Sequence, residues 1–288
     1  MDTASFVGVV QALGERALDA PAFQRAAEEV SRRGPELEQL PATALLGLVV
    51  AATKTGSLVA CLGKVADAAM ASLKAWPIGD VIKLLLAFAK AKGDLPLGVL
   101  HGVLQEISSV VSPHLAELPA PELIRLALAA ASSRLGEDAK DLLEAVAKEA
   151  AKRVSDLQPA HLLLLTQGIV PLGGRNPHVR QICSFWGELL LDSGGGAQDL
   201  VSERRRELER VRTLSTDQAV KLAALLAPLE PRLDEDTSER LGGALGGRLA
   251  SEARDLSDSA RDRLLERLRS DGSWRWLKEC KALRRALE

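Results

Sequence analysis

A two-helix sequence pattern recurs about every 40 residues along this chain, and that period constrains the fold more than any other feature. Seven short segments open its copies: Met1, Leu40-Pro41, Trp76-Pro77, Leu118-Pro119, Leu157-Gln158-Pro159, Leu214-Ser215 and Leu256-Ser257. Pro is tolerated in the first turn of a helix, where its missing N–H would lack an intrahelical partner anyway. The pattern predicts an all-α fold, a right-handed α-solenoid of about seven helix-turn-helix repeats of roughly 36–42 residues.

The first helix of each copy has a defined apolar face. Counted from each start as zero, apolar residues recur at +5, +8, +9 and +12, which is the spacing of one helix face. In the third copy these are Val81, Leu84, Leu85 and Phe88, and in the seventh copy Arg261 breaks the pattern at +5. We expect second helices at about 22–33, 58–74, 96–111, 138–154, 177–191, 236–252 and 273–287.

The spacing of the copies predicts one solenoid domain over 1–288 with two irregular regions. The step from Leu157 to Leu214 is about 18 residues longer than the others, which indicates an insertion at 192–213. Gly194, Gly195 and Gly196 interrupt regular structure there. The weakened pattern at 256–288 indicates a C-terminal capping repeat.

Composition agrees with a helical chain. Hydrophobic residues make up 47% of the chain, mostly Leu and Ala, and these are strong helix formers. The formal net charge is −2, whereas a protein that coats long nucleic acid over its whole surface is usually basic. A local basic track remains compatible with that value.

The sequence also bears on the compartment. Cys61, Cys183 and Cys280 are odd in number and far apart, which favours a reducing environment. No apolar run approaches the length needed to cross a bilayer. The N-terminus lacks the features of a signal or transit peptide, so either the chain is not imported or its presequence is already absent.

The segment WPIGDVIKLLLAFAKAKG at 76–93 resembles the first helix of octotricopeptide and heptatricopeptide repeats. The shared pattern is a Pro near the start, an apolar pair, a small residue, an apolar residue, Ala, Lys and a terminal Gly. Phe88 corresponds to an aromatic residue common in the middle of that helix, which most other copies lack. The resemblance implies organellar proteins that handle RNA, including ribosome-associated members. Armadillo and HEAT repeats have a similar length, so a generic helix-pair solenoid is the alternative.

Position +7 carries most of the basic residues that recur with the repeat. Lys83, Arg125, Lys221 and Arg263 occupy it in four of the seven copies, and we name this set the basic column. Lys54 and Lys90 share position +14 and widen it. Equivalent positions align along one surface of a stacked solenoid, so the column could follow a phosphate backbone. The alternative is a solvent-facing position filled with cations that favour helix.

Two further basic clusters lie in the irregular regions. Arg204, Arg205 and Arg206 could bind RNA or an acidic partner, but interleaved glutamates favour ion pairs along a helix. The C-terminal cluster mixes aromatic and basic side chains, which suits base stacking or an interface hot spot as well as a capping helix. Its members are Trp274, Arg275, Trp276, Lys278, Arg284 and Arg285.

No catalytic or metal-binding arrangement is evident in the sequence. His101, His114, His161 and His178 lie in different copies, and none has His or Cys at metal-ligand spacing. We therefore expect a non-catalytic scaffold without a cofactor, bound to RNA and to protein subunits of an organellar ribonucleoprotein, with the mitochondrial ribosome and its rRNA as leading candidate. Neither a membrane nor a small-molecule substrate is expected as partner. The alternative is a protein–protein adaptor of armadillo or HEAT type, located in the cytoplasm.

Overall fold

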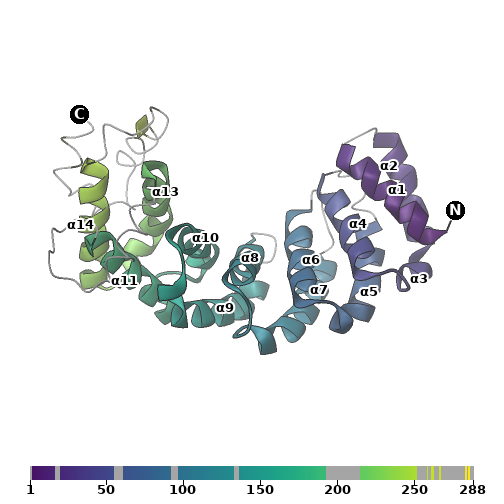
Figure 1. The fold of residues 1–288 in the computed structure, drawn as a ribbon, viewed down its shortest axis with the longest axis horizontal. Coiled ribbons are helices and arrows are strands. Elements are labelled where there is room, and N and C mark those ends of the chain that lie inside the picture. The colour runs from purple at the N-terminus through teal and green to yellow at the C-terminus, as the bar shows by residue number, and fades with distance from the viewer. Residues whose placement is uncertain are drawn as a thin grey trace. The chain divides into compact units, whose positions relative to one another are not determined.

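A computed structural model describes residues 2–16, 20–54, 61–91, 97–132, 136–192 and 215–251, with isolated positions beyond. Every regular element in these ranges is helical, and the described residues contain no strand (Figure 1). The predicted all-α class is confirmed. Residues 193–214 and most of 252–288 lie outside the described part, so the insertion and the C-terminal repeat stay predictions.

The internal contacts of the chain divide it into two compact units, Met1–Val146 and Ala147–Glu288. The first holds α1 (Thr3–Arg16), α2 (Ala20–Arg32), α3 (Gly34–Leu37), α4 (Ala42–Lys54), α5 (Leu62–Ser72), η2 (Leu73–Ala75), α6 (Ile78–Lys90), α7 (Leu97–Val111), η3 (Ser112–His114), α8 (Ala120–Ala130) and η4 (Gly136–Ala139). Helix α9 (Lys140–Lys152) contains the boundary between the units. The second unit continues with η5 (Val154–Asp156), α10 (Pro159–Ile169), η6 (Val170–Leu172), α11 (Pro177–Asp192), α13 (Thr216–Leu226), η7 (Ala227–Arg232) and α14 (Glu235–Ser251).

The second helices that fall in the described ranges were predicted to within a few residues. Helices α2, α5, α7, α9, α11 and α14 correspond to the six expected segments between 22 and 252. Helix α8 ends at Ala130, and Gly136 opens the 3-10 turn η4. Gly173 does follow the α10–η6 segment, with a φ of 77° that L side chains rarely adopt.

The described segments that open the repeats form the N-termini of helices. Pro77 and Pro119 take extended ψ angles of 134° and 153°, and each accepts the first backbone hydrogen bonds of its helix. The residue before the N-cap is buried in four copies: Leu40, Trp76, Leu118 and Leu157. That residue and position +5 have the spacing of a hydrophobic staple, which sets the angle at which the chain enters the helix. The recurring start is therefore part of the core as well as a helix signal.

The predicted apolar columns form the core in copies two to six, where all residues at +5, +8, +9 and +12 are buried. The buried residue at +9 of the fifth copy is polar, Thr166. The first copy differs, because α1 buries Thr3, Val7 and Val10 while Val9 at +8 is 47% exposed. The prediction for Val9 is wrong. Helix α1 takes its contacts from α4 and α2, and these select a face that is rotated from the expected one.

Each unit has the same packing pattern. In the first unit α1 contacts α4, α4 contacts α6 and α6 contacts α8, while α3, α5, α7 and η4 contact one another in the same order (Figure 1). In the second unit α10 contacts α13 and α11 contacts α14. Ala51, Ala87 and Ala129 at +11 are buried and let neighbouring first helices approach closely. First helices thus pack on first helices, and the second helices α5 and α7, and α11 and α14, pack on each other, with α3 and η4 at the two ends of the row in the first unit.

Candidate interaction surfaces

The two members of the basic column in the first unit are exposed and paired within their own helices. Lys83 Nζ lies 2.8 Å from Asp80 Oδ1 on α6, and Arg125 Nη1 lies 2.9 Å from Glu122 Oε1 on α8. The cations are 53% and 47% exposed, whereas their carboxylates are 19% and 24% exposed. Each pair therefore presents its cation outward above a more deeply placed acid.

This pairing weakens the attraction of the basic column for anions but leaves its cations exposed to solvent. An exposed i, i+3 pair contributes little to stability, and its cation still has N–H groups directed toward solvent. A phosphate that binds there must compete with a carboxylate already in place. The sequence contained this signal, because Asp80 and Glu122 both precede the basic residue by three positions.

Position +7 is not basic in every copy, because Gly47 and Leu164 occupy it in the second and fifth copies. Gly47 on α4 lies under the side chain of Gln11, whose Nε2 donates a hydrogen bond of 2.8 Å to Ala44 O. Leu164 on α10 is exposed, and so is Lys221 on α13. Lys90 is exposed at the end of α6. In the first unit, Lys83 and Arg125 on the contacting helices α6 and α8 are thus the basic part of the column.

Most of the other predicted binding residues fall outside the described part. These are the side chain of Lys54 and the residues Arg204, Arg205, Arg206, Arg263, Trp274, Arg275, Trp276, Lys278 and Arg284. Arg285 is described only as an exposed helical residue. Binding by the arginines of the insertion and by the C-terminal cluster therefore stays a prediction.

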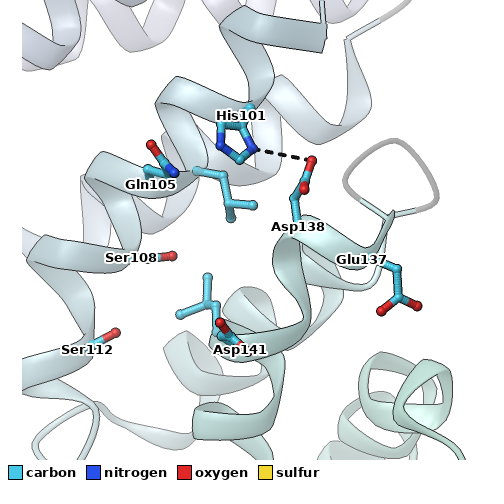
Figure 2. A pocket seen from close by; sticks show the side chains of 9 residues that line it. His101, Gln105, Ser108, Ser112, Glu137, Asp138 and Asp141 are labelled. Carbon is cyan, nitrogen blue, oxygen red and sulfur yellow. Dashed lines mark ion pairs between the residues drawn. The ribbon is translucent and has the colours of Figure 1, made fainter.

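A groove of about 490 Å³ in the first unit was not predicted from the sequence (Figure 2). One wall comes from α7 and η3 and carries His101, Gln105, Ser108 and Ser112 at successive turns. The other comes from η4 and the start of α9 and carries three carboxylates. The two remaining lining residues, Leu104 and Leu142, are buried. We name this feature the α7–α9 groove.

The walls of the groove meet at one polar contact. His101 Nδ1 lies 3.3 Å from Asp138 Oδ2, an ion pair when the imidazole is protonated, and Figure 2 shows the Asp138 side chain turned toward the ring. Glu137 pairs with Lys140 at 3.2 Å, and both side chains are largely exposed. No Lys or Arg is among the lining residues. The groove is therefore acidic on one wall, and its other wall carries hydrogen-bonding groups, His101 among them.

The described cysteines are placed as core residues. Burial raises the pKa of Cys61 to about 11 and that of Cys183 to about 12. Both thiols are therefore protonated at neutral pH, whereas a nucleophile or metal ligand has to be a thiolate. Among the described residues, no group of three or more His, Cys, Asp and Glu side chains is arranged to hold a metal ion.

The groove could not have been found by searching for motifs. His101 and Asp138 are about one repeat apart, and their proximity depends on the packing of η4 against α7. An alignment of the second helices would have placed them on neighbouring elements. It would not have shown the hollow, because that depends on side-chain size and on the path of the chain into η4.

No protein-family model matches the chain, and no curated protein or solved structure matches it either. In the part of the chain that the structure describes, no helix combines the length and apolarity that a bilayer crossing requires.

Proposed function

We propose that the chain is an α-solenoid over 1–288, with an insertion at 192–213 and a capping repeat at 256–288, and that it serves as a non-catalytic scaffold in an organellar ribonucleoprotein. The observation that carries the proposal is the repeated packing inside each unit, where first helices contact first helices, α5 contacts α7 and α11 contacts α14. Such stacking aligns equivalent positions of successive repeats, which is how solenoids build extended binding surfaces. The mitochondrial ribosome is the leading candidate, on the resemblance of 76–93 to octotricopeptide and heptatricopeptide repeats.

The basic column is the surface that we assign to RNA. Lys83 and Arg125 stand at the same repeat position on contacting helices, and both point their charges outward. Their own carboxylates reduce the net field, which agrees with the formal net charge of −2. We therefore expect weak, salt-sensitive RNA contact that supports a position inside a larger assembly.

The test is binding of a 20-nucleotide single-stranded RNA at several salt concentrations. The triple variant Lys83→Gln, Arg125→Gln, Lys221→Gln removes three column cations and leaves Asp80 and Glu122 unpaired. Each lost phosphate contact makes the log–log salt dependence shallower by about 0.7, so the slope should fall by about 2. A matched variant, Lys64→Gln, Lys74→Gln, Lys148→Gln, removes three exposed cations from outside the column. Equal losses in both variants would contradict the assignment of RNA to this column.

The second candidate is a protein–protein adaptor of armadillo or HEAT type. The observation that favours it is the pairing of Lys83 and Arg125 within their own helices, since neutralised pairs attract phosphates weakly. Under this function the parent chain binds no RNA even at low salt. Identification of what co-purifies with the native protein would then name the partner.

A further inference from the structure

We propose that the α7–α9 groove is the docking site for an extended, arginine- or lysine-bearing segment of a partner protein. The inference does not depend on RNA binding by the basic column, since it rests on different residues. It holds for a ribonucleoprotein subunit and for a protein–protein adaptor alike.

The shape of the groove suits a short extended segment. His101 and Ser112 mark the ends of the α7 wall, so at 1.5 Å per residue the wall is about 16 Å long. An extended chain advances about 3.3 Å per residue, and about five residues therefore match the wall. Gln105, Ser108 and Ser112 follow one another along it (Figure 2). Their amide and hydroxyl groups can both donate and accept, which a peptide backbone requires.

The opposite wall specifies the charge of the occupant. Glu137, Asp138 and Asp141 line it. His101 lies beside Asp138, and Lys140 outside the lining pairs with Glu137, but no Lys or Arg lines the groove and the carboxylates outnumber these partners. Carboxylates bind guanidinium groups through paired N–H···O bonds and ammonium groups as point charges. Leu104 and Leu142 also line the groove and expose only 2% and 4% of their surface, so the aliphatic stem of an Arg or Lys meets a small apolar area there. The same carboxylates repel a phosphate backbone, so RNA does not suit this groove.

The acidic wall alone would not indicate a ligand. Acidic residues in the first turn of a helix stabilise its N-terminus, and this accounts for Glu137, Asp138 and Asp141 next to α9. It does not account for the hollow or for the polar wall of α7 that faces them. The proposal depends on the two walls together, because they combine backbone recognition with charge recognition.

The probe is acetylated and amidated penta-arginine, titrated into the full chain by calorimetry at 50 mM salt. We expect one site per chain. The variant Glu137→Gln, Asp138→Asn, Asp141→Asn should lower the affinity about tenfold, as three weak surface pairs are lost. A matched variant, Glu28→Gln, Glu38→Gln, Asp67→Asn, removes three exposed carboxylates that lie outside the groove in the same unit, and it should change the affinity less than twofold.

A second variant distinguishes a loss of binding from a folding defect at the start of α9. Ser108→Lys keeps all three carboxylates but places a cation on the opposite wall, where it pairs with them and occupies the groove. It should weaken penta-arginine binding to a similar degree, while circular dichroism stays unchanged.

The proposal is overturned if the parent does not bind, if the matched variant loses as much affinity as the groove variant, or if Ser108→Lys binds like the parent. It is also overturned if the groove variant loses RNA affinity, because the groove would then hold RNA. Failure of the basic column in the RNA assay leaves these outcomes unaffected.

Discussion

Two polar side chains of this protein, Thr166 and Arg33, each have one partner within a helical turn and one that lies 20 or more residues away in the sequence. Trp186 Nε1 donates to Thr166 Oγ1 at 2.9 Å, and Thr166 Oγ1 donates to Leu162 O at 2.8 Å. Both side chains are buried, so water cannot replace either bond. At the other end of the chain, Arg33 donates to Glu29 and Thr3 and lies 4.9 Å from the ring centroid of Phe6. Such contacts tie neighbouring helices together at single residues.

Replacement of Thr166 tests the buried pair. Thr166→Val keeps the shape but leaves the Trp186 indole N–H without its acceptor, which should lower the free energy of unfolding by about 1–3 kcal/mol. Thr166→Ser keeps the hydroxyl and should be much milder. Urea denaturation followed by circular dichroism measures both. Equal losses in the two variants would show that the methyl group, and not the hydrogen bond, matters here.

Glu29 should make stability depend on acid. Hydrogen bonds from Arg32 and Arg33 lower the pKa of this carboxyl from 4.5 to about 2. Because the folded pKa is depressed, its contribution is fully present above pH 4.5 and disappears as the pH falls toward 2. The difference in stability between the parent and Glu29→Gln should therefore be largest at neutral pH and shrink across that window. A difference that stays constant from pH 7 to pH 2 would contradict this assignment.

At the scale of the element, helices are joined by contacts that depend on the absence of side chains. Gly47 on α4 leaves room for Gln11 of α1, and a Cβ at that position would overlap the Gln11 amide. Gly243 on α14 differs, since a Cβ there would meet nothing within 4 Å. Two glycines in helix interiors thus have opposite roles, although the sequence presents them alike.

A double-mutant cycle separates these roles. Gly47→Ala gains about 1 kcal/mol of helix propensity but displaces Gln11 from Ala44 O, a loss of about 1 kcal/mol, so its net effect should be near zero. In a Gln11→Ala background the same change should stabilise by about 1 kcal/mol. Gly243→Ala should stabilise without any such background, and chemical denaturation measures all of them. No coupling between Gln11 and Gly47 would contradict the packing of α1 on α4 described above.

At the scale of the whole molecule, each unit contains helices that contact mainly their neighbours in the repeat. In such an architecture, stability is close to a sum of repeat and nearest-neighbour terms. Damage to one repeat should then spread to adjacent repeats more than to distant ones. This follows from the proposed solenoid and can be tested on the intact chain.

Phe88→Ala provides that test, since Phe88 is fully buried on α6. The cavity should lower stability by about 3–5 kcal/mol. Amide hydrogen exchange should accelerate most in α4, α6 and α8 and least in α13 and α14 of the other unit. Uniform acceleration along the chain would show that it unfolds as one cooperative block.

Within the described residues, the sequence by itself determined the helical class, the approximate bounds of the second helices and the inward face of the first helices in copies two to six. These properties depend on neighbours within a few positions, where the 3.6-residue period, first-turn prolines and apolar columns act directly. The i, i+3 spacing of Lys83 and Asp80, and of Arg125 and Glu122, is equally local, so the sequence contains these ion pairs as well.

Only the tertiary structure decided which face α1 buries, which glycine lies under a neighbouring side chain, and where a groove opens. Val9 fits the apolar column yet is exposed, because the packing of α4 and α2 selects another line on α1. The α7–α9 groove needs two helices held side by side with small polar groups on one and acids on the other. A repeat period specifies which elements become neighbours. The shape and charge between them depend on side chains that are about one repeat apart in the sequence.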